Sequence, residues 1–229
     1  VESRDANKTY NKKSADEVAE MLNNFDFKKF IETSELSDVK EMVIRQPSYF
    51  EEFGELFNEV DLQAWKDYLS FRLVNEYASA LSEDISKRRF DFYGTTLRGT
   101  PEQEPRWKRA VDATNSVLGE VLGQVYVKEY FPPEAKEKME GLIENLRDAY
   151  GQSIRNLEWM TDETKEKALE KLKKFDPKVG YPSKWRDYSE LEISSTDLVA
   201  NYKAYAEFNY QEEIAKIGGP VDEEDWGMT

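Results

Sequence analysis

Apolar residues recur every three or four positions along most of this 229-residue chain. The clearest run extends from Leu62 to Leu81 and includes Trp65 and Leu69, which places one apolar stripe along about five helical turns. No stretch approaches the ~18 consecutive apolar residues that would cross a membrane. The spacing therefore predicts an all-α fold, a multi-helix lobe over residues 1–229 packed around one core, with no linker that separates two domains.

Capping residues mark where several of these helices begin. Ser14 and Glu17 form the capping-box pattern, in which the two side chains satisfy unpaired backbone amides of the first turn. Strands are expected only in one or two short pairs, near the apolar run 42–44 and near Val179. Three further residues precede periodic runs and are typical N-caps: Asp26, Asp61 and Thr161.

The chain contains neither cysteine nor histidine. These absences exclude disulfides, thiolate nucleophiles, Ser-His-Asp triads and zinc sites that need imidazole or thiolate ligands. The net charge of −15, from 32 basic and 47 acidic residues, disfavours binding to nucleic-acid phosphates. The first residues do not have the basic and apolar regions of a signal peptide. We therefore predict no nucleic-acid partner, and the composition leaves the cellular compartment unassigned.

One glycine-rich segment has the spacing of a phosphate loop, between Gly94 and Gly99. Thr100 and Pro101 stand where such a loop requires lysine and a hydroxyl residue, so a turn between helices is the favoured interpretation. Acidic pairs are so numerous along the chain that none is singled out as the carboxylate dyad of a glycosidase.

Three charged or polar runs also have a functional and a plainer interpretation. The acidic run 222–225 lacks the alternating ligands and central glycine of a calcium loop, which favours a solvated turn. The basic run 106–109 could meet an anion, but ion pairs with Glu102 and Glu104 are favoured. The run 7–9 is a glycosylation sequon, which matters only in a secreted eukaryotic protein.

Five aromatic residues stand on apolar helical faces or at helix ends. Aromatic residues at such positions are core residues by default, because their burial contributes strongly to stability. We predict packing roles rather than catalytic ones for this set: Trp65, Trp107, Tyr126, Trp159 and Tyr181.

A further set of motifs runs in a fixed order along nearly the whole chain. The longest is Trp159-Met160-Thr161-Asp162-Glu163-Thr164-Lys165, followed by Ala168. In this order the motifs resemble those of the neprilysin and endothelin-converting-enzyme family of zinc metallopeptidases, to which bacterial oligoendopeptidase O belongs. The other motifs are Arg4-Asp5, Tyr10-Asn11-Lys12, Tyr93-Gly94-Thr95-Thr96, Arg106-Trp107-Lys108-Arg109, Leu122-Gly123, Tyr126-Val127, Phe131, Val179-Gly180-Tyr181-Pro182 and Val221-Asp222 with Trp226.

The resemblance implies a helical lobe that faces a catalytic lobe across a peptide-binding cavity, in a parent enzyme that hydrolyses oligopeptides. It also implies that the parent enzyme holds zinc through an H-E-x-x-H helix, which this sequence does not contain. We therefore expect no catalytic residue, no metal ligand and no cofactor in residues 1–229, and an inactive chain by itself. The expected partners are the catalytic lobe of the same protein and peptide substrates, and the motifs do not identify substrate-contacting residues.

A free-standing, non-catalytic helical binding module is the alternative function. The gene beyond Thr229 would distinguish the two, because an open reading frame that continues to H-E-x-x-H fits only a peptidase lobe.

Overall fold

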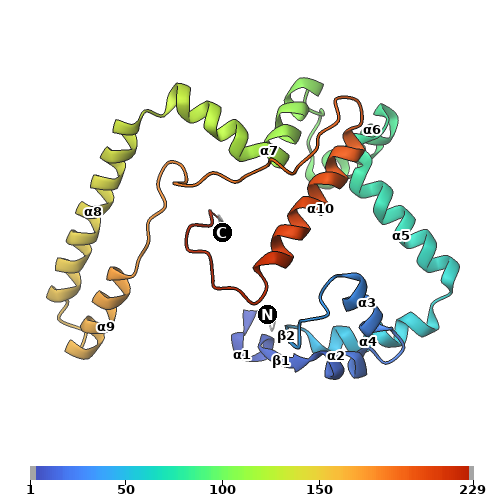
Figure 1. Ribbon diagram of the computed structural model, residues 1–229, viewed down its shortest axis with the longest axis horizontal. Helices are drawn as coiled ribbons and strands as arrows, with labels where there is room; N and C mark the ends of the chain where they lie inside the picture. The colour runs from blue at the N-terminus through green and yellow to red at the C-terminus, as the bar shows by residue number, and fades with distance from the viewer. Residues whose placement is uncertain (1–3, 227–229) are drawn as a thin grey trace. The chain divides into compact units, whose positions relative to one another are not determined.

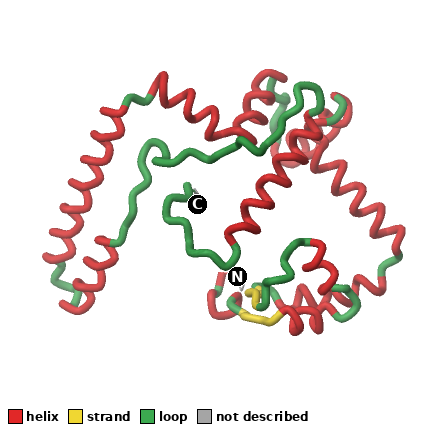
Figure 2. Tube along the Cα trace, viewed as in Figure 1, coloured by secondary structure: helices red, strands yellow, loops and turns green. Residues whose placement is uncertain are grey.

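The computed structural model describes residues 4–226 and is 66% helical (Figures 1 and 2). Within these residues the only sheet has two short antiparallel strands, so the predicted all-α fold is confirmed. The chain divides into two compact units, residues 1–103 with 194–219 and residues 104–193 with 220–229. The helices are therefore divided between two units rather than packed around the single core expected from sequence.

The first unit holds the sheet and most of the short helices. A π-helical turn, η3, follows α6 directly, and α10 returns to this unit from late in the chain. Its elements are α1 (Ala6–Thr9), β1 (Asn11–Ser14), α2 (Ala15–Leu22), α3 (Phe27–Thr33), β2 (Glu41–Ile44), α4 (Pro47–Glu59), α5 (Leu62–Tyr77), η2 (Ala78–Ala80), α6 (Glu83–Phe90), η3 (Asp91–Thr96) and α10 (Leu198–Lys216).

The strand pair joins β1 to β2, with Asn11 opposite Ile44 and Ser14 opposite Glu41. The expected strand at 42–44 is confirmed, whereas its partner β1 was not anticipated. Asparagine, lysine and serine are weak strand formers, so pairing of this segment comes from tertiary contacts rather than from its own sequence. Around Val179, where a second pair was allowed for, the described residues form no strand.

The buried core of the first unit lies where α2 packs on the sheet, α3 and α4. Four apolar side chains form it: Val18, Leu22, Phe27 and Ile44. Helix α4 approaches α2 closely at Gly54, where an added Cβ would lie 2.4 Å from the backbone oxygen of Leu22. Only glycine permits this approach, because the obstructing atoms belong to the backbone.

We predict opposite signs for two glycine-to-alanine substitutions in helices. Gly54→Ala should lower the free energy of unfolding by about 1–3 kcal/mol, because the new methyl group overlaps the backbone of Leu22. Gly141→Ala in α8 should raise it by about 0.5–1 kcal/mol, since nothing lies within 4 Å of the new Cβ. Urea denaturation measures both, and equal effects would contradict the close approach of α4 to α2.

The predicted helix starts are confirmed. The Glu17 carboxylate accepts the Ser14 amide at 2.8 Å, and the Ser14 hydroxyl accepts the Glu17 amide at 3.2 Å. The hydrogen bond from the Ser14 amide, together with Lys13, holds the pKa of Glu17 below its ordinary value of 4.5. The other expected N-caps accept backbone amides of their own first turns: Asp26, Asp61 and Thr161.

The lowered pKa of Glu17 predicts an acid-sensitive capping box. Its contribution is fully present above the ordinary value of 4.5 and is lost as the pH falls through the lower folded pKa. Glu17→Gln should therefore destabilise the protein at pH 7 and bring its stability closer to that of the wild type at about pH 3. Urea midpoints at the two pH values test this, with Glu32→Gln on α3 as the control; a pH-independent difference would count against it.

Among its described residues, the second unit contains three helices: α7 (Arg106–Tyr130), α8 (Pro133–Asn156) and α9 (Asp162–Lys173). Helix α7 is kinked at Leu118, whose φ of −119° and ψ of 34° are not helical. Helices α8 and α9 lie side by side, and an irregular segment follows α9 (Figures 1 and 2).

Candidate functional site

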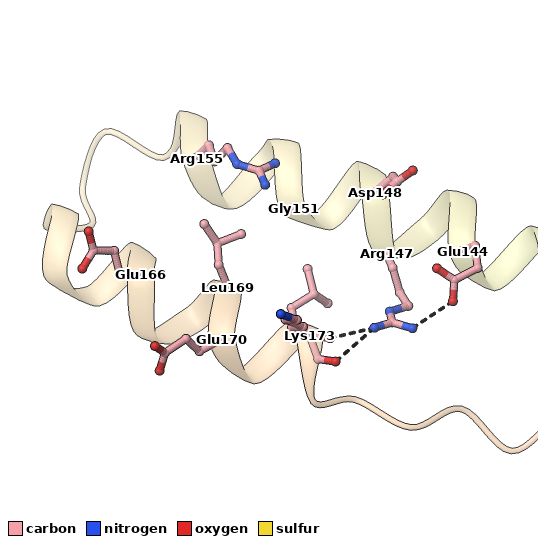
Figure 3. Close-up of a pocket in the computed structure, with 10 residues that line it drawn as sticks. Glu144, Arg147, Asp148, Gly151, Arg155, Glu166, Leu169, Glu170 and Lys173 are labelled. Carbon is pink, nitrogen blue, oxygen red and sulfur yellow. Dashed lines mark hydrogen bonds and ion pairs between the residues drawn. The ribbon is translucent and has the colours of Figure 1, made fainter.

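A cavity of about 560 Å³ lies between α8 and α9 (Figure 3). Arg147 of α8 spans it, donating to the Glu144 carboxylate at 2.8 Å and to the backbone oxygen of Lys173 at 3.2 Å. Beside it, Leu169 of α9 faces Gly151 of α8. The guanidinium thus satisfies a carbonyl at the end of α9, where an unpaired acceptor would otherwise remain. The arrangement fixes α9 on α8.

Within the second unit, three aromatic rings hold the segment after α9 against the end of α7 and the start of α8, and we call them the aromatic clamp: Phe131, Tyr181 and Trp185. The ring of Tyr181 stands edge-on to Phe131 at 5.8 Å and lies parallel to Trp185 at 6.0 Å. Lys136 of α8 lies 4.3 Å from the centre of the Tyr181 ring and donates to the Tyr181 carbonyl at 2.9 Å. One residue pair therefore combines a cation–π contact with a hydrogen bond.

Two motif glycines make room for the aromatic clamp. Gly180 has a φ of +72°, and a Cβ there would lie 2.8 Å from the Phe131 ring. A Cβ on Gly123 of α7 would lie 3.2 Å from Trp185. The Glu120 carboxylate accepts the backbone amide of Arg186 at 2.6 Å and fixes the same segment. The Val-Gly-Tyr-Pro and Leu-Gly motifs thus have a packing role in this unit.

The aromatic packing prediction is only partly correct. Tyr181 lies in the clamp, and Trp65 packs against Phe53 and Phe57 of α4, so both are packing residues. Three others are largely exposed, and for them the prediction is wrong within this chain: Trp107 is 66% exposed, Tyr126 61% and Trp159 77%. Helical spacing identifies an apolar face, but it does not say that the same chain covers that face.

A matched pair of tryptophan substitutions tests this assignment. Trp159→Ala should change the free energy of unfolding of this chain by less than about 0.5 kcal/mol, because its side chain is already exposed. Trp185→Ala should cost about 2 kcal/mol, since the half-buried ring loses its stacking on Tyr181. Thermal and urea unfolding measure both, and equal losses would show that Trp159 is packed.

The segment with phosphate-loop spacing is a π-helix that ends in a turn. A Cβ on Gly94 would lie 2.5 Å from the Phe90 ring, and Gly99 has a φ of +73°. The amide of Gly99 donates to the Thr95 carbonyl, and that of Thr100 donates to the Gly94 carbonyl. These amides are therefore used within the turn itself. The π-helix was not anticipated, because no sequence pattern separates it from an α-helical turn.

Residues of the acidic and the basic run form hydrogen bonds or ion pairs with other groups of the chain. In the acidic run, the Asp222 carboxylate accepts the Glu224 amide at 2.9 Å, and Lys178 donates to the Glu223 carbonyl. In the basic run, Lys108 lies 4.0 Å from the carboxylate of Glu104, one of its two predicted partners.

The sequon residues form the short helix α1. The backbone amide of Asn7 donates to the Asp5 carboxylate at 3.0 Å, and the Thr9 hydroxyl donates to the Asp5 carbonyl at 3.0 Å. The Asn7 side chain is exposed.

The residues of this chain do not suit a zinc ion. Zinc is held in proteins by cysteine, histidine and carboxylate ligands, and the sequence lacks the first two. Over residues 4–226, no three acidic side chains come together as a metal-binding group. No helix in this described range is both long and apolar enough to cross a membrane.

Comparison with known proteins defines the class. The model of peptidase family M13 matches residues 1–182, and the chain belongs to this family. A neutral endopeptidase of Lactobacillus helveticus is 30% identical over 221 residues, which cover 96% of this chain and 34% of that protein. Neprilysin-3 of Drosophila melanogaster is 27% identical, covering 85% of this chain and 26% of that protein. The resemblance stated from the motifs is thereby confirmed.

A solved structure gives the same result at the level of the fold. The zinc metalloprotease ZMP1 of Mycobacterium tuberculosis, in complex with an inhibitor, matches 99% of this chain with a TM-score of 0.88 and 38% identity. The match covers 34% of that protein. This chain therefore spans about a third of the length of the Lactobacillus helveticus endopeptidase and of ZMP1.

Proposed function

We propose that this chain is the helical cap lobe of a neprilysin-like zinc metalloendopeptidase and helps to enclose the cavity in which the parent enzyme binds oligopeptides. The observation that carries the proposal is the match to peptidase family M13 over residues 1–182. Its fold supports the same assignment, since nearly the whole chain superposes on a zinc metalloprotease.

The residues of this chain suit enclosure rather than bond cleavage. Helix α8 has 24 residues. It is therefore about 36 Å long, enough to form one wall of a large cavity. A wall of this kind excludes water and bulky chains from a reaction centre supplied by another part of the protein. The chain itself contributes shape and a net charge of −15, and its sequence contains no H-E-x-x-H segment.

The proposal predicts how peptidase activity divides between parts of the protein. Hydrolysis of a quenched fluorescent oligopeptide should be undetectable with the 229-residue chain, because it has no histidine or cysteine with which to bind zinc. The full-length protein should hydrolyse the same peptide and should lose that activity when a chelator removes its metal.

Removal of this segment from the full-length protein supplies the matched control. If the segment encloses the cavity, the shortened protein should lose turnover or its preference for short peptides. Zinc-dependent turnover by the 229-residue chain alone would overturn the proposal. Unchanged turnover and selectivity in the shortened protein would favour the free-standing binding module instead.

A further inference from the structure

Two open cavities adjoin in the first unit, where β2 leads into α4. Their volumes are about 540 and 580 Å³. Arg45 and Thr9 line both cavities, whereas Tyr10 lines the first and Tyr49 lines the second. We call the two cavities together the Arg45 groove. Each half of this groove therefore has one tyrosine, and the two halves share an arginine.

One residue of the Tyr-Asn-Lys motif holds the walls of the groove together. The side-chain amide of Asn11 donates to the Lys8 carbonyl at 2.9 Å and to the Ile44 carbonyl at 3.0 Å. Lys8 belongs to α1, and Ile44 is the last residue of β2, directly before Arg45. The Asn11 amide thus fixes the end of α1 beside the end of β2, so the fold itself sets the shape of the groove.

The Arg45 side chain has no partner within the chain. Among residues 4–226 it makes no hydrogen bond, ion pair or ring contact, and neither do the side chains of Gln46 and Ser48. A nearby cation does find a carboxylate, since Lys12 lies 2.6 Å from Glu41. The guanidinium therefore keeps its five N–H donors for a ligand, although 47 acidic residues outnumber 32 basic ones in this chain.

The charge of the groove is opposite to that of the chain. Its lining includes two basic residues, Lys8 and Arg45, and one acidic residue, Glu52, whereas the net charge of the chain is −15. Tyr10 and Tyr49 are 65% and 60% exposed, so both rings are open to apolar groups. A ligand that suits this groove has an anionic group for the guanidinium and an apolar or aromatic group on either side of it.

We infer that the Arg45 groove binds a peptide segment in which a carboxylate stands between two apolar or aromatic side chains. A carboxylate matches the forked donors of a guanidinium and accepts two parallel hydrogen bonds from it. An isolated anion would use the same donors but would leave both tyrosines uncovered, so a peptide is the better fit. The inference rests on the proposed function only in taking a peptide as the ligand.

A short peptide of matched design tests the inference on the 229-residue chain. An extended peptide points every second side chain to the same side, which places three such side chains along one groove. The probe is therefore acetyl-Phe-Gly-Glu-Gly-Phe-amide, whose blocked ends leave glutamate as its only charge. The matched probe has glutamine in place of glutamate. Binding is measured by calorimetry, and the bound site is located by NMR of the backbone amides.

The glutamate probe should bind at least about tenfold more tightly than the glutamine probe, because only the first has a charged acceptor for the guanidinium. Its NMR shifts should concentrate in residues 7–10 and 45–49. Raising the salt concentration should weaken its binding, since the site is open to solvent.

Three substitutions divide the binding among the residues of the groove. Arg45→Gln should weaken binding of the glutamate probe at least about tenfold, and Tyr10→Ser about threefold. Arg72→Gln, at an exposed arginine of α5 in the same unit, is the matched control and should leave binding unchanged. If Arg45→Gln lowers the urea midpoint, Arg45→Lys takes its place; it keeps the charge, loses the forked donors and should weaken binding severalfold.

Equal binding of the two probes, or shifts outside residues 7–10 and 45–49, would overturn the inference. Binding of acetate or inorganic phosphate as tight as that of the glutamate probe would also overturn it, because the groove would then recognise an anion alone. The titration is repeated with the full-length protein, where a loss of binding would show that other polypeptide occupies the groove and would count against a peptide ligand.

Peptidase activity is assayed separately on the full-length protein. Binding of the glutamate probe to a protein without peptidase activity would contradict the proposed function and leave the groove assigned. Peptidase activity without binding of the probe would contradict this inference alone.

Discussion

The main constraint on this structure is that many of its apolar helix side chains are not covered by other parts of the chain. The chain encodes more apolar helix surface than its own residues cover, and its best-defined core consists of four side chains around α2. Long helices with apolar faces, such as α5 and α7, are stable in a folded protein only when something packs on those faces. This constraint accounts for the exposed aromatic residues and for a surface larger than that of a self-contained domain.

Where the chain packs on itself, glycine and aromatic residues act together. Gly54 lets α4 approach α2, and Gly180 lets the backbone pass the ring of Phe131. Neither position leaves room for a Cβ. At Gly54 the obstacle is the backbone of Leu22, and at Gly180, whose own backbone is left-handed, it is the ring of Phe131. Two of the motifs that carry the family resemblance, those with Gly123 and Gly180, are thus motifs of close packing in this chain. This fits a segment that shapes a cavity and leaves the chemistry to other parts of the protein.

Local features of the fold were predictable from the sequence, and features that depend on distant partners were not. Ser14 and Thr161 cap helices through hydrogen bonds to residues three positions away, so their roles follow from neighbouring residues. The burial of Trp107 and Trp159 depends on what lies opposite them, which spacing along one helix does not reveal. Strand β1 also arises from tertiary contacts rather than from a sequence pattern. For the candidate site, the aromatic clamp became visible only in three dimensions, because its rings come from separate segments of the chain.

Hydrogen exchange of the α5 backbone tests most directly the claim that this chain depends on the rest of its protein. Amides of residues 62–77 should exchange by local opening in the 229-residue chain, because few contacts resist the separation of this helix from its surroundings. In the full-length protein the same amides should exchange far more slowly, at rates close to those of the slowest core amides. Equal protection of residues 62–77 in the two proteins would contradict the account, since α5 would then owe its stability to this chain alone.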